Sequence, residues 1–145
     1  MLKLGALPRE PYWIDLSSVA EGLRVKVRPI DPVAMALARR EAAEVFSEAE
    51  EGDQTANTRA GVGLVRALVR NGIVEWEGVA DEKDQPAQVT PDNIDRLLGL
   101  CPIYDRLDRD YATPAFTVDT EKNGSSSLPG GTTGTEAPTT AEPAA

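Results

Sequence analysis

Residues 23–42, LRVKVRPIDPVAMALARREA, decide the fold because a strand pattern turns into a helix pattern within them. At the start of this stretch apolar residues alternate with basic ones, which predicts a β-strand with one buried face. Pro29 ends the strand, since proline lacks the backbone N–H that a sheet needs. Asp31 and Pro32 then predict a helix start, because an aspartate can cap free backbone N–H groups and proline fits the first helical position.

Two other stretches add to the strand pattern. Residues 12–16, YWIDL, also alternate, and the SSVAEG segment after them predicts a β-hairpin with the strand at residues 23–28. Residues 73–77, IVEWE, form either a short third strand or an extended link in which Trp76 is buried. If they form a strand, its alternation places Ile73 and Trp76 on opposite faces.

Helical periodicity accounts for most of the remaining residues. We expect helices over residues 31–50 and 55–70, a third that begins at Thr90–Pro91, and a fourth after Pro102. The apolar side of the first helix consists of Met35, Ala38, Ala42, Val45, Phe46 and Ala49. The apolar side of the third ends at Cys101, which we expect to be a small core residue. The predicted fold class is therefore α+β and mainly α-helical, with an N-terminal β-hairpin followed by about four short helices.

The composition of the chain changes sharply near Asn123. Residues 124–145 are mostly Gly, Ser, Thr, Pro and Ala, with one leucine and no aromatic or basic residue. Such a segment cannot bury enough apolar surface to offset the entropy lost on ordering. We therefore predict a single folded domain over residues 1–123 and a disordered tail over residues 124–145.

The net charge of −9 at pH 7 restricts the classes of partner. An acidic surface repels phosphate backbones, and no stripe of basic residues interleaved with aromatic ones offsets this repulsion, so we expect no nucleic-acid partner. The first residues lack the pattern of a secretory signal, and no apolar run reaches membrane-spanning length. We therefore expect a cytoplasmic protein that does not contact a membrane.

Catalytic and metal-binding chemistry finds little support in the sequence. With no histidine and one cysteine, the chain cannot form an internal disulfide, a Cys/His zinc site or a histidine-based acid–base system. The acidic loop with Asp81, Glu82 and Asp84 does not fit a calcium-binding loop, which needs glycine at its sixth position and an acid at its twelfth. Pro86 stands at the sixth position, and Asp92, at the twelfth, lies inside a predicted helix. We expect a solvated turn, no metal or cofactor, and no enzymatic activity.

Three glycines mark the predicted second helix. Gly61 and Gly63 lie inside it, where each costs about 1 kcal/mol relative to alanine. They do not resemble a dinucleotide-binding loop, because a third glycine and a preceding strand are missing. A tight helix crossing or a flexible point would explain them. Asn71–Gly72 predicts the end of the helix, since glycine adopts the left-handed conformation at low cost.

A protein-binding surface is the remaining candidate site. Trp76 is either a core anchor or, if it is exposed, part of an interface, because tryptophan is enriched at binding hot spots. The glycine pair, this tryptophan and nearby arginines suggest a surface on the second helix and its neighbours. Its predicted members are Arg39, Arg40, Arg59, Gly61, Gly63, Arg66 and Trp76.

Three segments in series carry a resemblance to a known family. They are residues 23–42; residues 64–98, where a helix leads through W-x-G-V and a polar loop to a V-T-P helix start; and residues 101–131, where a helical end passes through E-K-N-G-S into the Ser/Gly/Thr/Pro-rich segment. In this order they resemble the tail assembly chaperones of long-tailed phages and of phage-derived gene transfer agents.

The resemblance implies a non-catalytic protein of the bacterial host cytoplasm that is absent from the mature virion. Such chaperones coat the long helical tape-measure protein and recruit tail-tube subunits during tail morphogenesis, and weak self-association is expected. Many members also have a longer form made by translational frameshifting, with which the change of composition near Asn123 is compatible. Two alternatives remain open: a structural head–tail connector or tail completion protein, and a small acidic inhibitor of a host protein.

Overall fold

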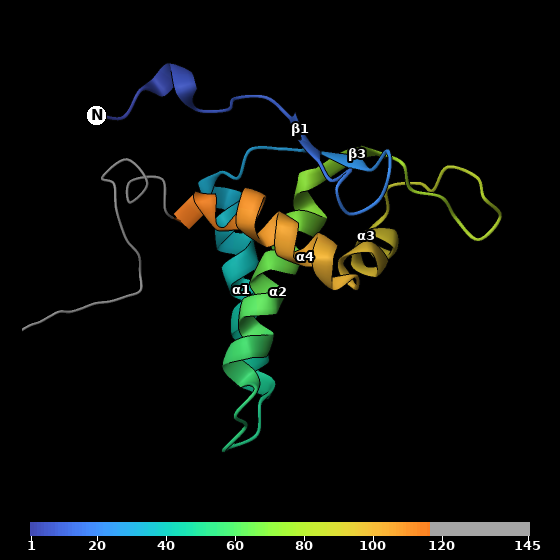
Figure 1. The fold of residues 1–145 in the computed structure, drawn as a ribbon. Coiled ribbons are helices and arrows are strands. Elements are labelled where there is room, and N and C mark those ends of the chain that lie inside the picture. Colours follow the sequence, from blue (N-terminus) through green and yellow to red (C-terminus); the bar gives the residue numbers. More distant parts are fainter. Residues whose placement is uncertain (117–145) are drawn as a thin grey trace, which may run out of the picture. The chain divides into compact units, whose positions relative to one another are not determined.

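The computed structural model describes residues 1–116 of the chain, so the predicted tail at residues 124–145 lies outside the described residues. The chain divides into a main unit, Pro8–Thr113, and a smaller one that includes Met1–Leu7 with a short 3₁₀ helix at Leu4–Ala6. The elements of the main unit are β1 (Tyr12–Asp15), β2 (Arg24–Val27), α1 (Pro32–Glu48), α2 (Ala56–Gly72), β3 (Ile73–Glu77), α3 (Pro91–Leu98), α4 (Cys101–Leu107) and a π-helical turn (Asp108–Ala112). The predicted α+β, mainly helical fold is confirmed (Figure 1).

The three strands form one antiparallel sheet in the order β1-β2-β3, so the hairpin and the third strand are both present. The register shifts between Lys26, which pairs with Glu75, and Val27, which pairs with Ile73. Val74 is thus an extra residue, and this bulge turns Ile73 to the buried side that Trp76 also occupies. The prediction that Ile73 and Trp76 face opposite sides is wrong, because simple alternation does not allow for a bulge.

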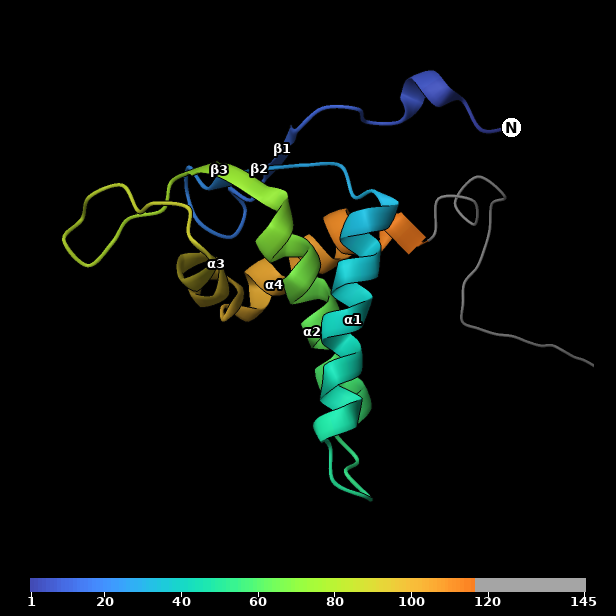
Figure 2. The same ribbon diagram turned by 180° about the vertical axis from the view of Figure 1, so that it is seen from behind.

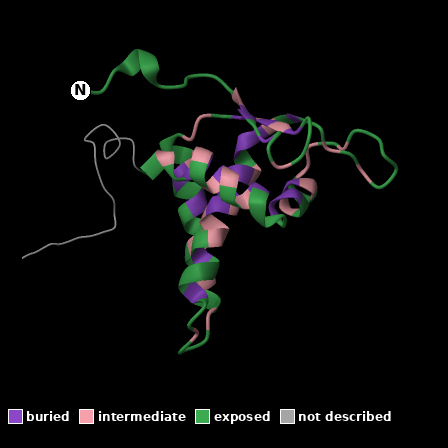
Figure 3. Cartoon of the chain, viewed as in Figure 1, coloured by how far each residue is buried: buried purple, intermediate pink, exposed green. Residues whose placement is uncertain are grey.

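The core lies where the sheet meets the helices. Figure 3 shows the buried residues gathered around the sheet and the neighbouring parts of the helices. The largest fully buried side chains are Leu16, Val25, Val27, Leu68, Val69, Ile94, Ile103 and Leu107. They come from β2, from α2, α3 and α4, and from Leu16 directly after β1, so no single helix pair makes the core by itself.

The two long helices, α1 and α2, lie side by side and extend beyond the core. In Figures 1 and 2 the loop that joins them points away from the sheet. Within α1 only Met35 and Ala38 are buried, whereas Phe46 is 50% exposed. The predicted apolar side of this helix is therefore only partly buried, because its second half runs past the core.

The predicted helix starts at Asp31 and Thr90 are confirmed. The Asp31 carboxylate accepts a hydrogen bond of 2.8 Å from the backbone N–H of Ala34, and the Thr90 hydroxyl accepts one of 3.1 Å from Asn93. Each cap is followed by a proline in the first helical turn, as the sequence predicts. Caps of this kind contribute about 1 kcal/mol each.

Gly72 is the last residue of α2, but it does not adopt the predicted left-handed conformation. It is not among the glycines with positive φ, which are Gly22, Gly52 and Gly78. Instead, a Cβ at Gly72 would lie 2.9 Å from Cζ of Tyr111, and the hydroxyl oxygen would be closer still. Glycine is required here because the Tyr111 ring lies against the backbone.

The glycine pair inside α2 does not mark a tight helix crossing. A Cβ at Gly61 would meet no atom within 4 Å, and one at Gly63 would meet only Cγ2 of Val45 at 4.0 Å. Both positions have room for a methyl group. The interpretation of close helix approach is therefore wrong.

Gly72→Ala and Gly61→Ala form a matched test, because both place the same methyl group in the same helix. We expect Gly72→Ala to lower the free energy of unfolding by about 2–3 kcal/mol, since the methyl group collides with the Tyr111 ring. Gly61→Ala meets open space and should raise it by about 1 kcal/mol. Urea unfolding followed by circular dichroism measures both. Equal effects of the two substitutions would contradict the close approach at Gly72.

Candidate protein-binding surfaces

The predicted surface residues separate into two places. Arg39 and Arg40 are exposed on α1, Arg59 and Gly61 are exposed on α2, and the half-buried Gly63 and Arg66 also belong to α2. Trp76 lies in β3, with 8% of its surface exposed. The structure thus brings the arginines and glycines onto one helical hairpin and leaves the tryptophan in the core.

Trp76 is a core anchor, and its interpretation as an interface residue is wrong. Its indole Nε1–H donates a hydrogen bond of 2.8 Å to the carbonyl oxygen of Ala87. The ring thereby ties β3 to the loop that returns from the acidic turn. A buried tryptophan that has found a partner for its N–H is a stable part of a core.

The outer face of the sheet carries Trp13, which is more exposed than Trp76. The Arg24 guanidinium lies 3.9 Å from the centre of the Trp13 ring and also forms an ion pair of 2.8 Å with Glu77. The Nζ of Lys26 lies 3.8 Å from Oε1 of Glu75, the residue that pairs with it on β3. The bond from Arg24 lowers the pKa of Glu77. The charges on this face are paired with one another, so it resembles a solvated surface more than a binding site.

The arginines on the α1-α2 helical hairpin differ in whether they form ion pairs. Arg59 forms an ion pair with Asp53 in the loop before α2 and a hydrogen bond of 3.1 Å with Thr55. Arg39 and Arg40, by contrast, have no ion-pair partner among residues 1–116. On an acidic chain, two adjacent unpaired arginines remain good candidates for contacts with another protein.

The exposed apolar residues of α1 were not predicted as binding residues. Val33 is 66% exposed and Leu37 is 41% exposed. They are four positions apart, so they lie on the same side of the helix. We call these two residues the Val33–Leu37 patch. It borders a cleft of about 260 Å³ whose other lining residues include Ala34, Leu68 and Tyr111.

Sequence periodicity could not find this patch, because it locates the face that packs on the core and not the face that a partner could cover. The only available signal was the presence of large apolar residues away from the predicted apolar side. Phe46 is a further exposed apolar residue of α1, although helical periodicity predicts it on the buried side.

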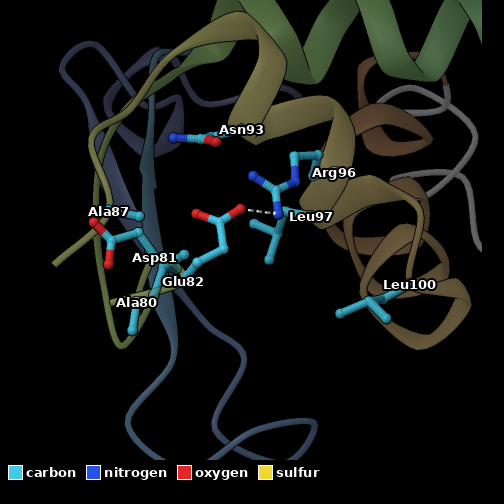
Figure 4. Close-up of a pocket in the computed structure, with 9 residues that line it drawn as sticks. Ala80, Asp81, Glu82, Ala87, Asn93, Arg96, Leu97 and Leu100 are labelled. Atoms are coloured by element: carbon cyan, nitrogen blue, oxygen red, sulfur yellow. Dashed lines mark hydrogen bonds and ion pairs between the residues drawn. The ribbon is translucent and has the colours of Figure 1, made fainter. Parts of the chain in front are cut away.

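A second cleft lies between the acidic loop and α3, as Figure 4 shows. We call it the α3 cleft. It measures about 410 Å³ and is lined by Val79, Ala80, Asp81, Glu82, Ala87, Asn93, Arg96, Leu97 and Leu100. Its apolar wall includes Leu100, which is 55% exposed. At the polar side of the cleft, Nη2 of Arg96 forms an ion pair of 2.8 Å with Oε2 of Glu82.

The carboxylates of the acidic loop have distinct local roles. The Asp81 carboxylate accepts hydrogen bonds of 2.8 and 3.0 Å from the backbone N–H groups of Lys83 and Gln85. A bond from its own backbone N–H and the Arg96 guanidinium lower the pKa of Glu82. Among residues 1–116, no group of three or more potential ligands is placed to hold a metal ion. Asp81 therefore shapes the loop, whereas Glu82 faces the cleft.

Cys101 is exposed, and its prediction as a core residue is wrong. It is the first residue of α4, and the apolar side of this short helix is formed by Ile103 and Leu107 instead. The periodicity of α3 does not continue through Gly99 and Leu100, because α3 ends at Leu98.

The exposed position of Cys101 gives a chemical test. We expect Ellman's reagent to modify the native protein completely at pH 8 without denaturant, because solvent reaches the thiol. A thiol that reacts only after urea is added would contradict the exposed position. The variant Cys101→Ser is the blank, since the chain has one cysteine.

Comparison with known proteins leaves the family open, because no family model, curated protein or solved structure matches the chain. Within residues 1–116, no helix combines the length and the hydrophobicity needed to span a membrane.

Proposed function

We propose that the protein is a phage tail assembly chaperone that binds the tape-measure protein and recruits tail-tube subunits in the bacterial cytoplasm, without catalysis. The observation that carries this proposal is the Val33–Leu37 patch, where two large apolar side chains stand exposed beside a cleft on a helical hairpin. The series of sequence segments that resembles this family supports the same function.

The geometry of the patch suits a helical partner. Two apolar side chains one turn apart on α1 can pack against the apolar stripe of an amphipathic helix, which repeats at the same spacing. The neighbouring cleft accepts a side chain of that helix between α1 and Tyr111. A long helical protein that would otherwise aggregate can be kept in solution by such contacts, since they cover its apolar surface.

The unpaired arginines are adjacent to this contact. Arg40 follows Leu37 by three positions and so lies on the same side of α1. Its guanidinium can pair with a carboxylate beside the apolar stripe of the partner, which would add orientation more than affinity. Arg40 is thus the member of the predicted surface that fits the proposed contact best.

Co-expression with the tape-measure protein tests the function. We expect a soluble complex that elutes as one species in size-exclusion chromatography. Replacement of both patch residues, Val33→Ser with Leu37→Ser, should reduce the yield of complex about tenfold or more, because the loss of two apolar anchors costs at least about 1.4 kcal/mol.

The matched control replaces two exposed leucines of the N-terminal segment, Leu2→Ser with Leu4→Ser, and should leave the yield unchanged. The proposal fails if the tape-measure protein stays insoluble in the presence of the chain. It also fails if purified mature particles contain this polypeptide in a fixed copy number.

A further inference from the structure

The α3 cleft combines an apolar floor with an acidic border. Val79, Ala87, Leu97 and Leu100 supply the apolar lining, and Leu97 is 9% exposed while Leu100 is 55% exposed. A large apolar side chain that is half exposed at the mouth of a cleft loses water when a partner covers it. The cleft can therefore accept an apolar side chain of leucine size.

The loop that forms one wall of the cleft is held in place by its own hydrogen bonds. Asp81 N–H donates to the Gln85 carbonyl at 2.8 Å, and Ala87 N–H donates to the Val79 carbonyl at 2.9 Å. The bond from Trp76 to Ala87 then anchors this wall to the sheet. A wall that is already ordered requires little loss of conformational entropy when a partner binds.

The opposite wall is fixed by the start of α3. The side-chain amide of Asn93 donates a hydrogen bond of 2.9 Å to the carbonyl oxygen of Gln88. On the far side of α3, Asp95 accepts a bond from Arg70 of α2 at 3.3 Å. The position of α3 is thus set from two sides, and the cleft is present before any partner arrives.

The charges around the cleft determine which charge on a partner is attracted. Two carboxylates, from Asp81 and Glu82, line the cleft together with one cation, Arg96. The loop also carries Lys83 and Asp84, and Asp92 stands in the first turn of α3. Arg96 pairs with Glu82, and Asp92 acts on the same guanidinium at longer range. Since negative charge remains in excess, a positively charged group is attracted to this border and a carboxylate is repelled.

We propose that the α3 cleft is a docking site for a segment of another protein in which a leucine-sized apolar side chain is flanked by lysine or arginine. The apolar side chain enters between Leu97 and Leu100, and the flanking cations lie beside Asp81 and Glu82, the two carboxylates that line the cleft. This site is formed by different residues from the Val33–Leu37 patch. It goes beyond the proposed function, because it provides the chain with a second partner surface of defined chemistry.

The test uses the full chain and two synthetic 15-residue helical peptides as probes. One carries leucines at every third or fourth position with lysines between them, and the other has glutamate in place of every lysine. Fluorescence polarisation of the labelled peptides gives the affinities. We expect the lysine peptide to bind at least about tenfold more tightly, with binding that weakens as salt rises.

A matched pair of variants separates this site from a general attraction to an acidic protein. Glu82→Lys with Leu100→Ser changes the cleft, and Glu10→Lys with Leu4→Ser makes the same changes of residue type at exposed positions outside both proposed surfaces. All of these side chains are at least partly exposed, and circular dichroism checks that each variant is folded.

We expect the cleft variant to lose about tenfold or more in affinity for the lysine peptide and the control variant, Glu10→Lys with Leu4→Ser, to change by less than about threefold. The inference is overturned if both variants lose affinity equally, if the glutamate peptide binds as tightly as the lysine peptide, or if neither peptide binds. Failure of the tape-measure complex alone would leave this result unaffected, because the assay contains no tape-measure protein.

Discussion

The structure depends on the hydrogen bond from the Tyr111 hydroxyl to the carbonyl oxygen of Arg28, which measures 2.6 Å. Tyr111 is 4% exposed, and burial raises the pKa of its hydroxyl, so this group stays protonated and can donate. The backbone N–H of Arg28 in turn donates to the Gly72 carbonyl at 2.9 Å. The end of β2, the end of α2 and the π-helical turn thus meet at one point.

This junction borders one of the two proposed partner surfaces. It lies beside the start of α1, and Tyr111 and Gly72 both line the cleft next to the Val33–Leu37 patch. A second link comes from Arg106 of α4, which donates to the Asp15 carbonyl at 3.0 Å and to the Ser18 hydroxyl at 2.6 Å. Hydrogen bonds therefore join α4 and the π-helical turn to both ends of the β1-β2 hairpin. The proposed partner surfaces belong to elements that several such contacts hold in place.

Local signals in the sequence were sufficient for most of the elements. Alternation predicted the strands, and the Asp31 and Thr90 caps predicted two helix starts, because these features depend on neighbouring residues alone. The bulge at Val74 and the requirement for glycine at position 72 depend on a partner strand and on a tyrosine far along the chain. The sequence order does not reveal such contacts, and for the same reason Phe46 and Cys101 were predicted to be buried.

The candidate site was harder to predict than the fold. The helical hairpin was identified through its arginines and glycines, but the exposed apolar residues and both clefts arise only when elements pack together. Trp76 is a predicted member because tryptophan is common at interfaces. The structure buries it and gives its indole N–H a hydrogen bond to the Ala87 carbonyl, a contact that periodicity does not show. Under the proposed function, this protein acts through its exposed apolar surfaces by covering another protein. Hydrogen–deuterium exchange of the full chain, with and without the tape-measure protein, tests this claim most directly. We predict that the partner slows exchange in residues 32–48, and unchanged exchange throughout that helix in the presence of a bound partner would contradict the account.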